Sequence, residues 1–155
     1  MVFARTRRAL FILICCVSTI AVAQHNDADR AQALVGCWAT TVGTFKAMSK
    51  YGVDSGQTNV PPRVRFDSAP GRSIANQPLG RLLRAIPGFS GTQYRDGYWV
   101  IGEHDDIGLT WSTGFTGLGM SVRQTGDTLR GYAKVWTDYG GDQRAPVTLH
   151  RIRCP

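Results

Sequence analysis

The chain has 155 residues, a formal net charge of +7 and four cysteines. This length corresponds to a single domain. Part of the charge comes from Arg5, Arg7 and Arg8, which stand near the amino terminus without a neighbouring acid. The remaining positive charge is mild, so the composition does not indicate a nucleic-acid-binding protein.

Residues 1–23 have the features of a secretory signal peptide. A basic start precedes an apolar run, which ends in the small-residue pattern Ala21-Val22-Ala23. The run is about 15 residues long, whereas a membrane-spanning helix needs roughly 20, and no second apolar stretch follows. We therefore expect cleavage after Ala23 and no transmembrane segment in the mature chain. A membrane anchor, or a lipoprotein signal at Cys15 or Cys16, remains an alternative.

Cleavage would remove 23 of the 155 residues, leave 132, and lower the charge from +7 to +4 by removing three arginines. The cysteines that remain, Cys37 and Cys154, form an even pair. In an exported protein such a pair predicts a disulfide. We expect a periplasmic or extracellular protein with a flexible amino-terminal lead-in at residues 24–34 and one domain at residues 35–155.

From residue 35 onward, short runs of aromatic and β-branched residues alternate with glycine-rich turn signals, which is typical of an all-β protein. These runs predict an antiparallel up-and-down barrel of seven to eight strands, since closure removes the exposed sheet edges. A Cys37–Cys154 disulfide would then join the first and last strands. We expect strands at Val35–Val42, Arg63–Ser68, Tyr94–Glu103, Ile107–Thr113, Gly117–Gln124, Thr128–Asp138 and Pro146–Arg153, and a weaker one near Phe45–Tyr51.

The segment 78–86 has a different pattern. Leu79, Leu82, Leu83 and Ile86 follow the spacing i, i+3, i+4 and i+7, and a proline stands at each end of the run. This spacing predicts a short helix that plugs one end of the barrel. A lid or a helix that touches a membrane is the alternative.

The sequence Gly36-Cys37-Trp38 on the first strand and the basic residue Arg151 on the last strand resemble the lipocalin/calycin group. The resemblance implies an eight-stranded barrel in which Arg151 packs across the Trp38 ring at the closed end. We assign this role to Arg151 rather than Arg153 because Arg151 shares a strand face with Val147 and Leu149. The rest of the chain departs from the group, because no other motif of the group is present.

The residues offer little for catalysis. There is no Gly-x-Ser-x-Gly elbow, and Glu103 is the single glutamate. We expect Glu103-His104-Asp105-Asp106 to be a solvated turn rather than a metal site, since neighbouring strand residues point to opposite faces. Asp138 and Asp142 fit a turn better than a weak calcium site. The sequence therefore predicts no catalytic residues, no bound metal and no cofactor.

Aromatic residues are the remaining signal for binding. On the strand that begins at Thr128, Arg130, Tyr132, Lys134 and Trp136 alternate with small apolar residues, so we expect a basic-aromatic outer face. Inside the barrel, the candidates to line a pocket for a small apolar ligand are Trp99, Trp111, Phe115 and Met120.

The sequence favours an exported, non-catalytic binding protein that carries a small apolar or amphiphilic molecule in the barrel interior. The alternative is a protein-interaction or inhibitor module that uses the basic-aromatic outer face. A hydrolase or isomerase with a site at the barrel mouth is a lesser alternative.

Overall fold

A computed structural model describes residues 27–47, 60–71, 73–74, 77–88, 97–113, 115–137 and 142–155. The predicted signal peptide at residues 1–23 and most of the weak strand predicted near Phe45–Tyr51 lie outside the described residues. The chain divides into two compact units, residues 1–34 and residues 35–155. No helix among the described residues is both long enough and apolar enough to span a bilayer.

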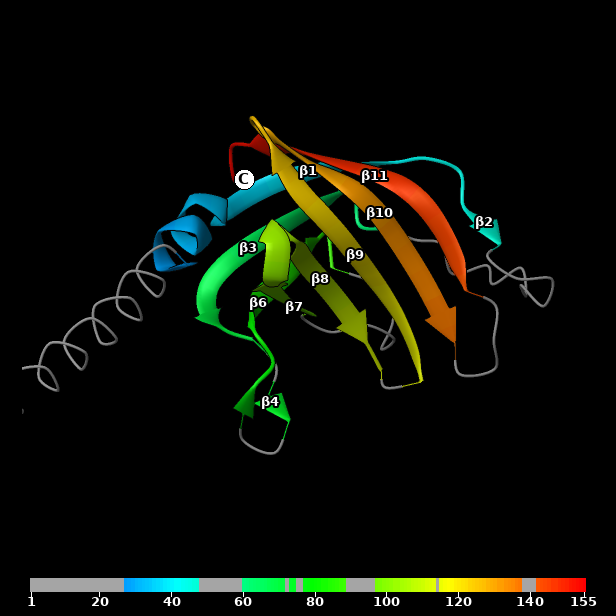
Figure 1. The fold of residues 1–155 in the computed structure, drawn as a ribbon, viewed down its shortest axis with the longest axis horizontal. Coiled ribbons are helices and arrows are strands. Elements are labelled where there is room, and N and C mark those ends of the chain that lie inside the picture. Colours follow the sequence, from blue (N-terminus) through cyan, green and yellow to red (C-terminus); the bar gives the residue numbers. More distant parts are fainter. Residues whose placement is uncertain are drawn as a thin grey trace, which may run out of the picture. The chain divides into compact units, whose positions relative to one another are not determined.

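Eight strands of the second unit form a closed antiparallel up-and-down barrel, as the sequence predicted (Figure 1). Each strand pairs with the next one in the ring, and the last strand pairs with the first through six residue pairs, from Cys37–Ile152 to Val42–Val147. In ring order the strands are β1 (Gly36–Val42), β3 (Arg63–Pro70), β6 (Arg81–Ile86), β7 (Gly97–Ile101), β8 (Ile107–Ser112), β9 (Thr116–Thr125), β10 (Thr128–Thr137) and β11 (Gln143–Ile152).

Short elements lie at the ends of the barrel. Strand β2 (Lys46–Ala47) pairs with the first residues of β11, and β4 (Ser73–Ile74) forms a small hairpin with β5 (Gln77–Pro78). A 3-10 turn, η1 (Glu103–Asp105), joins β7 to β8. The connections alternate between the two ends of the barrel, as an up-and-down meander requires.

The helix predicted at residues 78–86 is wrong. Residues 81–86 form β6, which pairs with β3 on one side and β7 on the other. The apolar spacing suits a helix, but a short apolar run also fits a strand, and here two neighbouring strands each need a hydrogen-bonding partner. Leu83 points inward and is completely buried, whereas Leu82 and Ile86 lie on the outer face and are half-buried.

Among the described residues, a helix covers residues 27–34 instead, within the segment 24–34 that the sequence predicted to be a flexible lead-in. Ala31 and Leu34 lie one helical turn apart, and both are buried. The alanine-rich composition of this segment favours a helix, even though Ala31 and Leu34 are its only buried apolar residues among those described.

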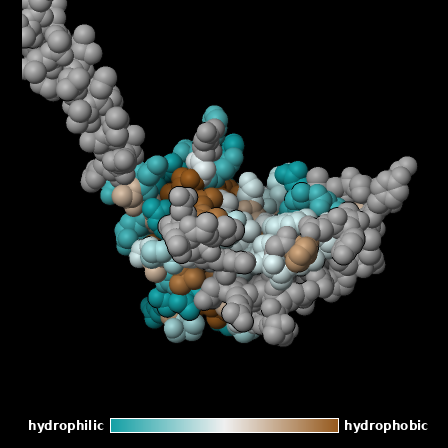
Figure 2. All heavy atoms as spheres, turned by 90° about the horizontal axis from the view of Figure 1, so that it is seen from below, coloured by the Kyte–Doolittle hydropathy of each residue, from teal (hydrophilic) through white to brown (hydrophobic). Residues whose placement is uncertain are grey.

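The barrel interior is apolar, and on several strands buried residues alternate with more exposed ones. Along β8, for example, Ile107, Leu109 and Trp111 are buried, while the residues between them are half-buried. On the face shown in Figure 2, apolar residues form small separate groups between hydrophilic ones. The largest fully buried side chains include Trp38, Trp99, Trp111, Phe66, Leu83, Ile107, Leu109, Leu129 and Leu149.

One end of the barrel is sealed by a cluster of aromatic rings, which we call the floor. The Trp38 and Phe66 ring centroids are 5.9 Å apart, and those of Phe66 and Trp99 are 5.2 Å apart. Guanidinium groups cover this cluster: the Arg151 Cζ lies 4.6 Å from the Trp38 centroid, and the Arg81 Cζ lies 5.1 Å from the Trp99 centroid.

Two further links hold the floor. The Arg151 guanidinium donates a hydrogen bond to the carbonyl oxygen of Val35 at 3.0 Å. The predicted disulfide joins Cys37 on β1 to Cys154, two residues beyond β11, across 117 positions of sequence. The seam between the first and last strands is therefore closed by hydrogen bonds, an arginine and a covalent bond.

Candidate functional site

The structure separates the four residues that the sequence proposed as an interior ligand site. Trp99, Trp111 and Met120 are at most 3% exposed and face the barrel interior. Trp99 belongs to the floor, and its indole N–H donates to the carbonyl oxygen of Asp67 at 3.0 Å. Phe115 instead lies on the connection between β8 and β9 and is 70% exposed.

A groove of about 300 Å³ lies on the outside of the barrel, across four neighbouring strands from β8 to β11. The strand register explains how its residues meet: Thr110, Gly119, Lys134 and Arg144 are successive partners across the four strands. Met120, a core residue, also borders the groove. The outward-pointing side chains that line it are Thr110, Ser121, Tyr132, Lys134, Trp136 and Arg144.

The Trp136 indole lies against the backbone of β9. A Cβ atom added at Gly117 would overlap the Trp136 ring, and one added at Gly119 would lie 3.1 Å from its Cζ3. Because the two glycines have no side chain, the indole can occupy the space above them. Trp136 is half-buried. This arrangement supports one side of the ring on β9 and makes it part of the groove wall.

Tyr132 carries the second aromatic ring of the groove. Its side chain is 48% exposed, and the guanidinium Cζ of Arg144 on the next strand lies 3.7 Å from the ring centroid. A guanidinium stacked on a ring keeps its in-plane N–H donors available at the edges of the pair. The pair therefore presents an aromatic surface and a fixed positive charge side by side.

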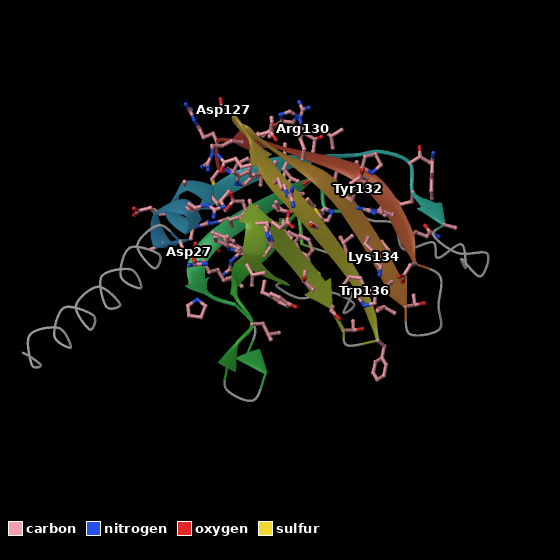
Figure 3. The ribbon with its side chains drawn as sticks, viewed as in Figure 1. Asp27, Asp127, Arg130, Tyr132, Lys134 and Trp136 are labelled. Atoms are coloured by element: carbon pink, nitrogen blue, oxygen red, sulfur yellow. A yellow bond between two sulfur atoms is a disulfide. The ribbon has the colours of Figure 1, made fainter. Side chains whose placement is uncertain are left out.

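Lys134 lies between the two aromatic residues on β10, and its Nζ is 2.5 Å from a carboxylate oxygen of Asp142. Figure 3 shows Arg130, Tyr132, Lys134 and Trp136 in a row along β10, as the sequence predicted for the outer face. The hydroxyl-bearing residues Thr110 and Ser121 border the opposite side of the groove. The groove thus combines aromatic surfaces, ammonium and guanidinium donors, and hydroxyl groups.

Another ion pair lies on the outer surface of β9. Arg123 Nε is 2.5 Å from Asp106 Oδ1, and this hydrogen bond is the main cause that lowers the pKa of the Asp106 carboxyl below its ordinary value. Asp106 follows the η1 turn, in which His104 and Asp105 have positive φ values of 56° and 69°. The Glu103–Asp106 segment is therefore a turn, and its last carboxylate is held by an arginine.

Among the residues with described positions, no three His, Cys, Asp or Glu side chains are grouped closely enough to hold a metal ion. Asp142 pairs with Lys134, and the other acid of the proposed calcium alternative, Asp138, lies outside the described residues. The Asp142 carboxylate near the groove therefore forms an ion pair with a neighbouring lysine.

Two components of the groove were not predicted. Arg144 lies on β11, whose start at Gln143 is three residues earlier than the sequence indicated. The sequence indicates turn and strand-bend roles for its glycines, whereas Gly117 and Gly119 allow the close approach of the Trp136 ring. The register that joins Gly117 to Trp136 follows from the two-residue turn Gly126-Asp127, which pairs Thr125 with Thr128.

Comparisons with known proteins add no information about this geometry. The chain matches no protein-family model, no curated protein and no solved structure. What the fold defines is a closed eight-stranded antiparallel barrel with a sealed floor and a basic-aromatic groove on its outer wall.

Proposed function

We propose that the protein is an exported, non-catalytic binding protein of the lipocalin type, and that it binds a small anionic ligand in the outer groove. The observation that carries this proposal is the combination of Tyr132, Lys134, Trp136 and Arg144 around one groove of about 300 Å³. That volume is at the lower end of the range for small-molecule sites.

The charge and shape of the groove favour this class of ligand. Lys134 and Arg144 supply donors to a carboxylate or phosphate, and charge-assisted hydrogen bonds of this kind are stronger than those between neutral groups. The rings of Tyr132 and Trp136 offer apolar surface for the rest of the ligand. A bound anion would compete with Asp142 for the Lys134 ammonium, so Lys134 would exchange one negatively charged partner for another.

Kinship with the lipocalin/calycin group is part of the proposal. The closed barrel, the Arg151 guanidinium over Trp38 and the short helix at residues 27–34 support it. Export is supported by the signal-like residues 1–23 and by the Cys37–Cys154 disulfide, a bond typical of oxidising compartments. Amino-terminal sequencing of the secreted protein should begin at Gln24, and a start at Met1 would rule out cleavage.

Calorimetric titration with soluble anions tests the binding proposal, with glycerol phosphate and glucuronate as first probes. The double variant Lys134→Gln/Arg144→Gln should bind at least tenfold more weakly, because it removes both cations without changing the size of the side chains greatly. Arg63→Gln, an exposed position on β3, is the matched control and should bind like the unchanged protein. Equal affinity of the double variant and the control would refute an anion site in the groove.

The barrel interior is a second candidate site, for an apolar or amphiphilic ligand. The observation that favours it is the Thr40 hydroxyl, a buried polar atom with no hydrogen-bond partner among the described residues. Thr40 shares a strand face with Trp38 and is paired with the buried Leu149, so it faces the interior. A polar group of an amphiphilic ligand, or a water molecule, would satisfy it. Loss of retinoid or fatty-acid binding in Thr40→Val would support this site.

A further inference from the structure

We infer that the anionic ligand of the outer groove is the headgroup of a bilayer lipid, and that Phe115 enters the membrane interface beside it. This inference rests on the proposed anion site and identifies the chemical source of the anion. It assigns a role to an exposed apolar side chain that the groove itself does not use. The surface in question consists of Phe115, Trp136, Lys134, Tyr132 and Arg144, and we call it the docking strip.

The first observation is the position of the exposed apolar residues. In the part of the chain that the structure describes, the large hydrophobic side chains with high exposure are Phe115, at 70%, and Tyr132, at 48%. Single exposed apolar residues are common on protein surfaces. Both of these, however, lie along the same pair of strands: Phe115 immediately precedes β9, and Tyr132 is paired with Ser121 on that strand.

The register places Phe115 at the Trp136 end of the groove. Gly117, two residues after Phe115, is the direct partner of Trp136, and Lys134 is the partner of Gly119. Alternate residues on a strand are separated by about 6.5–7 Å. Phe115, Trp136, Lys134 and Tyr132 therefore follow one another along the outer wall, and the most exposed apolar residue is at the end.

The connection that carries Phe115 is tied by its own hydrogen bonds. The Thr113 amide donates to the Thr116 carbonyl oxygen at 3.0 Å, and the Ser112 hydroxyl donates to the same oxygen at 3.2 Å. The Thr116 amide in turn donates to the Thr113 hydroxyl at 3.3 Å. These hydrogen bonds satisfy the groups of Ser112, Thr113 and Thr116 that form them, which lowers the cost of desolvating those groups when Phe115 enters an apolar phase.

The strip carries cations that suit an anionic bilayer, and the Asp142 carboxylate is paired with one of them, Lys134. Lys134 and Arg144 lie beside Trp136 and Tyr132, and Arg130 continues the row along β10. Basic residues near an anionic membrane attract it, and Trp and Tyr side chains prefer the interface between lipid and water. Phe115 is the single strongly exposed apolar side chain of the strip, so attachment through it would depend on charge as well.

Vesicle flotation tests the inference, with the exported protein and vesicles of phosphatidylglycerol and phosphatidylcholine in equal parts. The protein should bind these vesicles and not vesicles of phosphatidylcholine alone. Phe115→Ala should weaken binding about tenfold, because the apolar anchor is lost. Lys134→Gln/Arg144→Gln should weaken it about 25-fold, at about fivefold for each cation removed. Arg63→Gln is the matched control and should change binding less than twofold.

Phe115→Trp provides a second readout that does not depend on the loss of affinity. This variant should bind as tightly as the unchanged protein, and the emission of the new tryptophan should shift to the blue when phosphatidylglycerol vesicles are added. No shift, or full binding by Phe115→Ala, would overturn the assigned role of Phe115. Melting temperatures of both variants should equal that of the unchanged protein, since the side chain is exposed.

The outcomes separate the inference from the proposal on which it depends. Binding of soluble anions without binding of vesicles overturns the membrane inference and leaves the anion site in place. Binding of polyglutamate, an acidic polypeptide, in the absence of vesicle binding would overturn it in favour of an acidic protein partner. Binding of none of these probes contradicts both the inference and the proposed function.

Discussion

The same pair of chemical groups occurs in two regions of this barrel. In the floor, the Arg151 guanidinium lies 4.6 Å from the Trp38 ring centroid, and Trp38 is only 1% exposed. On the outer wall, the Arg144 guanidinium lies 3.7 Å from the Tyr132 ring centroid, and Tyr132 is 48% exposed. The first pair closes the barrel, whereas the second is presented to solvent. Burial, rather than the type of contact, distinguishes the two pairs.

The largest effect should follow from opening the covalent link beside the floor. Cys37→Ser/Cys154→Ser should lower the free energy of unfolding by about 4–5 kcal/mol, an upper value from the entropy of a loop of this length. Thermal unfolding of the variant and of the reduced unchanged protein should give the same lowered melting temperature. Two free thiols in the native exported protein would contradict the account.

Removal of the aromatic ring should have unequal effects in the two regions. Trp38→Ala should destabilise the protein by about 3–5 kcal/mol, because it leaves a cavity among Phe66 and its neighbours. Tyr132→Ala should lower the free energy of unfolding by no more than about 1 kcal/mol, since an exposed cation–π contact contributes little to stability. Chemical denaturation of both variants measures the difference, and similar losses in the two variants would remove the distinction between floor and wall.

A change at Gly117 should affect the wall without a change in the groove's charges. In Gly117→Ala the new methyl group would overlap the Trp136 ring. We therefore expect the indole to be displaced and the free energy of unfolding to fall by about 1–3 kcal/mol. The fluorescence of Trp136 should also become more like that of an exposed indole. Gly126→Ala is a poor control because Gly126 has a positive φ of 59°, whereas Gly119→Ala has a more distant contact and should perturb less.

The smallest effect should come from the Asp106–Arg123 pair, which is exposed. The guanidinium lowers the pKa of the Asp106 carboxyl from its ordinary value of 3.8. The pair therefore adds stability above about pH 4, and this contribution is lost as the pH falls through the lowered pKa. Melting curves of the unchanged protein and Asp106→Asn should differ slightly at pH 7 and converge at lower pH. A constant difference across that range would contradict the pairing.

Most of the barrel was predictable from the sequence because its signals are local or follow strict alternation. Seven of the predicted strands lie within a few residues of their observed positions, and the pairing of Cys37 with Cys154 followed because they are the two cysteines beyond the predicted signal peptide. The β6 strand was missed because Leu82, Leu83 and Ile86 carry a helical spacing. The segment forms a strand because it pairs with both β3 and β7. Neither partner is joined to it by a short turn, so no local signal in the sequence indicates the pairing.

The outer site was predictable only in part. The alternation along β10 placed Tyr132, Lys134 and Trp136 outside. The contribution of Arg144, and the contact of Trp136 with Gly117, depend on how β9 and β11 are aligned with β10. The two-residue turn Gly126-Asp127 pairs Thr125 with Thr128 and thereby sets the β9–β10 register locally. The connection between β10 and β11 is longer, so the alignment that brings Arg144 beside Lys134 has no such local signal.

The indole N–H signals of the four tryptophans in an NMR titration give the most direct test of where ligands bind. Trp38, Trp99 and Trp111 face the interior, and Trp136 borders the outer groove. Upon addition of glycerol phosphate or of bicelles that contain phosphatidylglycerol, the Trp136 signal should shift while the other three stay in place. Shifts of Trp99 and Trp111 with an unchanged Trp136 signal would contradict the account and locate the ligand inside the barrel.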